Sequence, residues 1–340
     1  MLMQKLQSGI ARTLFSLPTP VLRRLAGKPK VVEGETLHPA FQVLLGVGEK
    51  SGKPPLEALG VAGARREYEV LVEEIMAASE PPAPRTRDVR VEGVPVRIHH
   101  PAPGRKVPVI VYFHGGGWTI GSLRTHEPLC RRLSRVSGCA VAAVDYRLAP
   151  EHPFPAAVDD CLASVHGLRD AADRYELDPE RVALAGDSAG GNLAAVVGQA
   201  LGRAGEAVQY QLLYYPGTDA ALARPSRELF AKGFGLDRTT TDWMIDQYAR
   251  GVDRKDPRLS PIHGDLEKSP PTRLVVGHFD PLRDEGLEFA DALQDAGVPV
   301  ETVLVPDMIH AFVHATRLSR VRAVLDADAL RVRAALGRDA

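Results

Sequence analysis

The chain has 340 residues and a formal net charge of -1, with 44% hydrophobic and 25% charged residues. These values are ordinary for a globular protein with a substantial core. The balanced charge provides no basic surface that would indicate nucleic-acid binding and no acidic tail. No apolar run reaches the roughly 18 residues of a membrane span, and the N-terminus lacks the apolar centre of a secretion signal. The odd number of cysteines, without a C-x-x-C pair, favours buried thiols over disulfides or metal ligands at Cys130, Cys139 and Cys161. We therefore expect a reduced, cytoplasmic protein without stable membrane insertion.

Helices are predicted for the first 80 residues, because apolar side chains recur there at helical spacing. The two stripes are Leu2, Leu6, Ile10, Leu14 and Leu17, and Val70, Leu71, Ile75 and Met76. Such stripes are typical of helices that dock on their own protein, and for the first helix a membrane surface or a partner stays as the alternative. The prolines within 81–84 mark the boundary to a segment with a different pattern.

Strands and helices are predicted to alternate from residue 107 to the C-terminus, after a hairpin-like pair at 88–90 and 94–100. Short continuous apolar runs mark the strands at 107–113, 139–144, 182–185, 211–215, 274–276 and 298–305. Helices are expected at 156–172, 189–201, 287–295 and 318–336. Uninterrupted apolar runs indicate strands buried on both faces, so we expect an α/β fold with a mostly parallel sheet flanked by helices. The polar stretch 216–271 interrupts the alternation and is predicted to form a lid or a pocket wall.

A serine at a sharp turn is the first candidate for chemistry. Residues 186–190 read Gly-Asp-Ser-Ala-Gly and fit the G-x-S-x-G elbow, which lifts the hydroxyl of Ser188 above a sheet between a strand and a helix. The pattern alone is weak evidence. A serine hydroxyl also needs a base, a group that orients this base, and hydrogen-bond donors for the oxyanion. In an open α/β sheet, these groups are expected at the carboxyl ends of strands.

Oxyanion donors are predicted at two places. The strand 107–113 runs directly into His-Gly-Gly-Gly-Trp at 114–118, a glycine loop of the type that supplies such donors in lipases and esterases. The backbone N–H of Ala189 follows the serine at the start of a helix, where the helix dipole favours negative charge. We expect both segments to face the carbonyl oxygen under attack.

The orienting acid and the base also follow predicted strands. Asp280 comes just after a buried strand and is favoured over Asp284, which suits the first turn of the next helix. His310 comes after the last strand and gives the order Ser, Asp, His that α/β-hydrolases share. His278 and His314 are its neighbours in the sequence, and neither occupies this position.

Together these motifs resemble those of the bacterial hormone-sensitive-lipase-like esterases, in the branch with a G-D-S-A-G elbow. The matching stretches are 114–118, 146–157, 186–192, 280–286 and 308–312. The resemblance implies an α/β-hydrolase fold with the catalytic triad Ser188, Asp280 and His310. It further implies an oxyanion hole formed by Gly116, Gly117 and Ala189.

A helical cap is another implication of this resemblance. Residues 1–80 and 216–271 would form the cap, and residues 81–215 and 272–340 the hydrolase core. Candidate walls of the substrate pocket are Trp118, Trp243 and Met244. The family places glycine after the catalytic histidine, whereas this chain has Ala311. This departure bears on the width or conformation of the loop and not on the role of His310.

The activity that the resemblance implies is that of a serine carboxylesterase, which hydrolyses short- to medium-chain esters through an acyl-enzyme without metal or cofactor. An amidase or deacetylase with the same triad stays open, because pocket shape selects the leaving group. A non-catalytic small-molecule receptor on the same fold is disfavoured by the intact His310. The last strand, 298–305, is expected at an exposed edge of the sheet, where it could pair with its copy in a homodimer.

Overall fold

An eight-stranded sheet forms the centre of the computed structural model, which describes residues 13–337 except 73–77, 79 and 207. The strand order is β10-β9-β8-β7-β5-β6-β4-β3. The bounds are β3 Arg85–Val91, β4 Val94–His100, β5 Val107–Phe113, β6 Ala140–Val144, β7 Leu177–Asp187, β8 Tyr210–Tyr214, β9 Thr272–Phe279 and β10 Val300–Ile309. The strands from β10 to β6 run parallel, and β4 pairs antiparallel with both β6 and β3. The predicted α/β fold with a mostly parallel sheet is confirmed.

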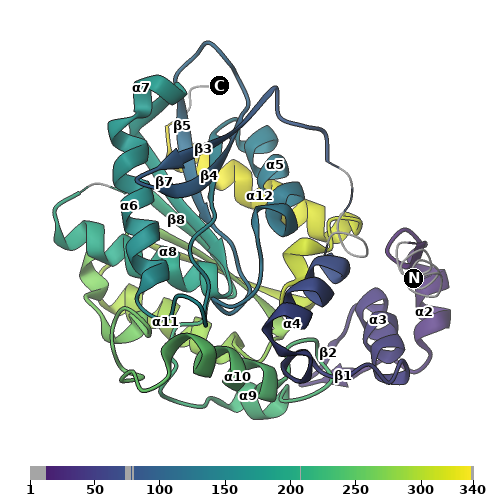
Figure 1. Ribbon diagram of the computed structural model, residues 1–340. Coiled ribbons are helices and arrows are strands. Elements are labelled where there is room, and N and C mark those ends of the chain that lie inside the picture. The colour runs from purple at the N-terminus through teal and green to yellow at the C-terminus, as the bar shows by residue number, and fades with distance from the viewer. Residues whose placement is uncertain (1–12, 73–77, 79, 207, 338–340) are drawn as a thin grey trace.

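Helices cover both faces of this sheet (Figure 1). α5 packs against α12 on one face, and α6 packs against α8 on the other. The bounds are α5 Leu123–Ser137, α6 Ala156–Asp170, α7 Ala172–Tyr175, α8 Ala189–Arg203, α11 Arg283–Asp295 and α12 Ser319–Ala335. This double cover explains why every residue of β5, β6 and β9 is buried and why β5 and β6 are continuous apolar runs. No helix in the described part of the chain is long and apolar enough to cross a membrane.

Helix α5 was not predicted from the sequence. It is mostly polar and contains Pro128, yet Leu129 and Leu133 on its inner side are buried. Its ends are well defined, because Ser122 and Thr125 form a reciprocal capping box and Gly138 ends the helix in a left-handed conformation. Docking on the sheet and on α12 therefore outweighs a composition that does not favour a helix.

The described N-terminal residues form several short elements at the end of the sheet where the parallel strands finish (Figure 1). They are α2 Thr19–Ala26, α3 Pro39–Lys50, the 3-10 turn η1 Leu56–Leu59 and α4 Gly60–Glu69. A two-stranded hairpin of β1 Val31–Val32 and β2 Glu35–Thr36, not predicted from the sequence, lies among them. α9 Pro225–Leu229 and α10 Arg238–Ala249 lie at the same end. The predicted apolar positions Leu2, Leu6, Ile10, Ile75 and Met76 lie outside the described residues.

Candidate active site

Ser188 lies at the apex of a strained turn between β7 and α8. Its backbone has φ 54° and ψ -119°. Residues other than glycine rarely adopt this conformation, which is typical of functional turns. Space explains the flanking glycines. A Cβ on Gly186 would lie 2.3 Å from the carbonyl oxygen of Gly190, and a Cβ on Gly190 would lie 2.0 Å from that of Phe113. The glycines therefore allow β7, α8 and β5 to meet next to the serine.

His310 connects Ser188 to Asp280. Its Nε2 lies 2.9 Å from Ser188 Oγ, and its Nδ1 lies 2.8 Å from Asp280 Oδ2. Asp280 is fully buried after β9, and its Oδ1 accepts a hydrogen bond from the backbone N–H of Leu282 at 2.7 Å. The imidazole follows β10 directly. The ends of three parallel strands thus bring together the three side chains that the sequence singled out.

The neighbouring acid and histidine have other partners. Asp284 accepts hydrogen bonds from the backbone N–H of Ser226 and from the guanidinium of Arg283, both at 2.8 Å, in the first turn of α11. His278 Nε2 lies 3.1 Å from the carbonyl oxygen of Val32. Within the described part of the chain, neither Asp284 nor His278 forms a hydrogen bond with Ser188 or His310.

Glycines form the loop that faces the serine. Gly116 has φ 121° and Gly117 has φ 56°. A Cβ on Gly116 would lie 2.2 Å from the carbonyl oxygen of Ile120, and a Cβ on Gly117 would lie 2.1 Å from Met244 Sδ. Gly117 and Ala189 line the same cavity as the serine, whereas Gly116 is not among its lining residues. The glycine loop and the start of α8 therefore meet at this cavity, where the helix dipole favours negative charge.

A cavity opens beside Ser188, with about 490 Å³ of empty space when its mouth to the solvent is included. Apolar side chains form most of its wall, and three charged side chains, Asp219, Arg227 and Glu285, also border it. Burial raises the pKa of the Glu285 carboxyl, although the Arg227 guanidinium lies 3.2 Å away. The other lining residues are Gly117, Trp118, Ala189, Gly217, Ala220, Leu236, Thr241, Met244, Ile245, Leu259 and Leu282.

Helix α10 supplies one wall of this cavity. Thr241, Met244 and Ile245 line it, because positions i, i+3 and i+4 share one face of a helix. Trp243 was predicted as a wall and is not among the lining residues, since neighbouring helix positions point about 100° apart. It packs instead against the small apolar cluster that contains Ala64 and Met244. Helical spacing in the sequence would have selected the threonine and the isoleucine in its place.

The residue after the histidine adopts the backbone conformation that glycine favours. Ala311 has φ 60° and ψ 18°, in the left-handed region. His310 keeps both of its contacts with this alanine beside it. The methyl group is therefore accommodated by backbone strain and not by a displaced imidazole.

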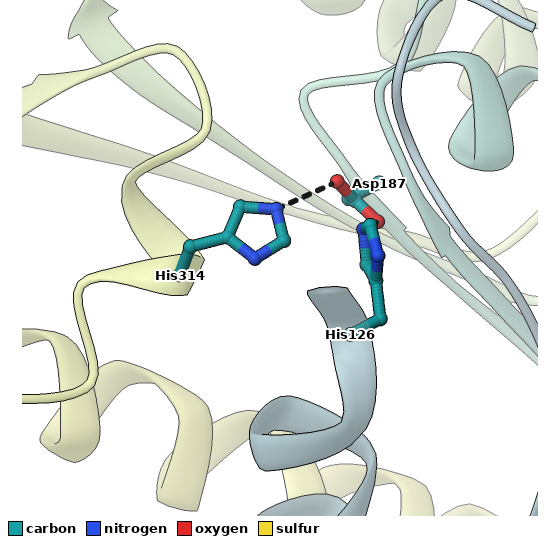
Figure 2. Close-up of side chains that lie close together, drawn as sticks. All are labelled: His126, Asp187 and His314. Atoms are coloured by element: carbon teal, nitrogen blue, oxygen red, sulfur yellow. Dashed lines mark ion pairs between the residues drawn. The ribbon is translucent and has the colours of Figure 1, made fainter. Parts of the chain in front are cut away.

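One group of described side chains has the composition of a metal site: His126, Asp187 and His314. All three are buried, and their ligand atoms lie within 4.8 Å of one another. They come from α5, from the end of β7 and from the turn η5 Phe312–His314. Figure 2 shows the His314 ring facing the Asp187 carboxylate, with the His126 ring close to the same carboxylate. The two rings lie edge to face, with their centroids 4.6 Å apart. Sequence analysis did not single out this group, because its members are spread over the chain.

The comparison with known families identifies this architecture. The model of a family described as the alpha/beta hydrolase fold matches residues 110–314, a span that contains Ser188, Asp280 and His310. The chain belongs to this family. The α/β-hydrolase is 39% identical over 316 residues to the carboxylic ester hydrolase LipN of Mycobacterium tuberculosis, which covers 89% of this chain and 84% of LipN.

Two further relatives extend the comparison. The α/β-hydrolase is 36% identical over 287 residues to the ethyl acetate hydrolase of Pseudomonas putida, which covers 80% of this chain and 90% of the relative. It superimposes on the crystal structure of an α/β-hydrolase from the metagenome of Lake Arreo, Spain, with a TM-score of 0.82 and 37% identity. That match covers 87% of this chain and 96% of the other. The predicted α/β-hydrolase fold and the resemblance to hormone-sensitive-lipase-like esterases are confirmed.

Proposed function

We propose that this hydrolase is a serine carboxylesterase with Ser188 as nucleophile, His310 as general base and Asp280 as the orienting acid. The observation that carries the proposal is the continuous chain of contacts from Ser188 Oγ through His310 to Asp280, at 2.9 Å and 2.8 Å. These are hydrogen-bond distances suited to proton transfer. The names of two relatives, a carboxylic ester hydrolase and an ethyl acetate hydrolase, support ester cleavage as the reaction.

Acylation follows from this geometry. Ser188 Oγ attacks the carbonyl carbon of the ester and transfers its proton to His310 Nε2. The buried Asp280 accepts the Nδ1–H of the ring, which holds the tautomer and stabilises the imidazolium that forms. The backbone N–H groups of Gly116, Gly117 and Ala189 donate to the oxyanion. When the tetrahedral intermediate collapses, the alcohol leaves with the proton from the imidazolium.

Deacylation repeats these steps with water as the nucleophile. His310 Nε2 takes a proton from water, and the resulting hydroxide oxygen attacks the acyl carbon. The collapse of the second intermediate releases the carboxylic acid and returns the proton to Ser188 Oγ. The same three side chains therefore serve both halves of the reaction.

Short- to medium-chain acyl groups are the substrates that we propose. Trp118 and Met244 give the cavity apolar walls, and the ionisable side chains of Asp219, Arg227 and Glu285 border it. These charged side chains interrupt the apolar wall, and a long alkyl chain would gain less free energy from contact with them than from contact with apolar side chains. A series of p-nitrophenyl esters from acetate to palmitate is expected to peak at the short to medium members. A maximum at palmitate would contradict this preference.

Labelling of the serine tests the reaction class. A fluorophosphonate probe is expected to label the wild type and not Ser188→Ala, and ester hydrolysis is expected to disappear with the label. Ser51→Ala is the matched control, because Ser51 is exposed and its hydroxyl forms hydrogen bonds within its own turn. Folded wild-type protein that takes no label and cleaves no ester would contradict the proposal. Faster cleavage of the matching anilides than of the esters would assign an amidase.

A cap over the cavity is part of this proposal, made of residues 1–80 and 216–271. Contacts between the two segments support it, since Thr240 Oγ1 donates to Glu57 Oε2 at 2.8 Å. Met244→Ala is expected to shift the acyl-chain profile, because its side chain lines the cavity. Asp246→Ala, at an exposed position of the same helix, is the control and is expected to leave the profile unchanged.

A homodimer through β10 and a cytoplasmic location stay predictions. β10 is an edge strand of the sheet, and Leu304 on it is 43% exposed. An edge strand presents unpaired backbone groups that a second copy can bind. Light scattering is expected to give a dimer mass that Leu304→Lys lowers, and a monomeric wild type would contradict the interface. Cell fractionation tests the location.

A further inference from the structure

The carboxylate of Asp187 stands next to the nucleophile in the chain and is buried. Three groups approach its Oδ1: the hydroxyl of Tyr112 at 2.7 Å, the backbone N–H of Gly115 at 2.9 Å and Nε2 of His126 at 3.0 Å. His314 Nε2 lies 3.4 Å from the other oxygen of the carboxylate, Oδ2 (Figure 2). The reaction steps described above use none of these contacts, although a buried anion is costly unless it is well paired.

Hydrogen bonding accounts for this group better than a metal ion. Zinc binds histidine nitrogen and carboxylate oxygen at about 2.0 to 2.2 Å, with the ion between the ligand atoms. Here His126 Nε2 lies at hydrogen-bond distance from Asp187 Oδ1, which also accepts from Tyr112 and Gly115. An ion bound at this oxygen would compete with these donors. The backbone nitrogen of Gly115 also lies 3.1 Å from His126 Nε2. The Thr125 hydroxyl, which donates to the carbonyl oxygen of Ser122, has its oxygen 2.8 Å from His126 Nδ1.

The charge of Asp187 is stabilised in place. Burial by itself would raise the pKa of this carboxyl, but His126 and His314 beside it hold the pKa well below its ordinary value. Tyr68, from the N-terminal segment, extends the network because its hydroxyl lies 3.3 Å from His314 Nε2. The buried Asp187 carboxylate at the elbow therefore holds together polar groups from several separate segments.

The network lies next to both segments that carry the proposed oxyanion donors. Gly115 directly precedes Gly116 and Gly117, and Asp187 is separated from Ala189 only by the serine. The hydrogen bond from Gly115 to Asp187 therefore links the two backbone segments that carry the proposed oxyanion donors. The segments are in close contact, since a Cβ on Gly115 would lie 2.3 Å from Asp187 Oδ2 and 2.7 Å from its carbonyl oxygen.

We propose that Asp187 and His126 are positioning residues that fix the distance between the glycine loop and the start of α8, and so keep the oxyanion donors converged. Neither side chain touches the reacting atoms in this role. The inference rests on the proposed ester hydrolysis, because it assigns a function to the donors only in that reaction. A loose oxyanion hole binds the transition state less well while leaving the apolar contacts of the substrate intact.

Asp187→Ala and Asp187→Asn test the proposal together. The alanine variant is expected to lower kcat by about 100-fold, the order of the loss of one oxyanion donor, with little change in KM. The asparagine variant keeps an oxygen that accepts from Gly115 and Tyr112, so its kcat is expected to lie between alanine and wild type. Asp178→Ala, at the other end of the same strand, is the control and is expected to match the wild type.

A transition-state analogue separates positioning from general disruption. A trifluoromethyl ketone forms an oxyanion with Ser188, and its inhibition constant is expected to rise in Asp187→Ala by the factor by which kcat/KM falls. Should that variant fail to fold, His126→Ala gives the same readout, because it removes one of the groups that hold the carboxylate. Equal losses in the alanine and asparagine variants, or an unchanged ketone affinity in the folded alanine or histidine variant, would overturn the inference. If the wild type cleaves no ester, the proposed function is wrong. The affinity of the variants and the wild type for the ketone can still be compared in that case, because binding is followed by fluorescence.

Discussion

Ala311→Gly is a substitution whose effect on stability can be worked out from the backbone. An alanine in the left-handed region carries a strain of about 1 to 2 kcal/mol, which glycine removes. Glycine also loses about 0.5 to 1 kcal/mol more conformational free energy on folding than alanine does. The net expectation is a free energy of unfolding that is unchanged or higher by about 1 kcal/mol. The variant is expected to retain esterase activity, since His310 keeps its contacts.

The matched control is Ala327→Gly, at an exposed position within the helix α12. There the alanine carries no strain, and the same change is expected to lower the free energy of unfolding by about 1 kcal/mol. Urea unfolding followed by circular dichroism, with equal slopes for all three proteins, measures both changes. A loss of stability in Ala311→Gly as large as that in Ala327→Gly would refute the reasoning from strain.

Three further predictions concern stability and reactivity. Burial lowers the pKa of His99 to about 4, so above pH 6.5 the histidine is neutral in both states, and as the pH falls toward 4 only the unfolded chain gains its proton. This group is expected to reduce the free energy of unfolding by up to about 3 kcal/mol over that range, and His99→Gln is expected to flatten the dependence in urea midpoints. Gly190→Ala is expected to lower the free energy of unfolding by about 4 kcal/mol or more, because the new Cβ would collide with the backbone of β5. Gly48→Ala, in open space on α3, is the control and is expected to raise the free energy of unfolding by about 0.4 to 1 kcal/mol. Equal effects of the two substitutions would contradict the collision. Burial raises the pKa of Cys130 and Cys161, so a thiol reagent is expected to react with neither in native protein and with all three cysteines in denaturant.

The sheet could be predicted from the sequence because burial leaves a strong local signal. The apolar run at 107–113 has the same bounds as β5, since this strand is covered on both faces and all of its residues are apolar. Helix α5 and the β1–β2 hairpin carry no such signal. The burial of Leu129 comes from docking on other elements, and the strands 31–32 and 35–36 are too short to show a period.

The candidate site divides in the same way. Ser188, Asp280 and His310 could be selected from the sequence, because each follows an apolar strand and the chain order is informative. The border of the cavity could be predicted only in part: Trp118 and Met244 line it as expected, whereas its charged side chains were not selected. Glu285 fits a first-turn acid in the sequence and proves to be buried beside Arg227, which lies on a segment far away in the chain. Such pairings depend on how loops meet in space, which no local pattern records.

The contacts of the N-terminal segment have a consequence for protein synthesis. Tyr68 reaches His314 and Glu33 reaches Arg283, over sequence separations of 246 and 250 residues. At a translation rate of about 5 to 20 residues per second, these side chains emerge roughly 12 to 50 s before their partners exist. The first part of the chain must therefore stay free of aggregation on the ribosome until the last strands are made. The site can therefore form only after almost the whole chain has been synthesised, even though the N-terminal segment beside it is translated first.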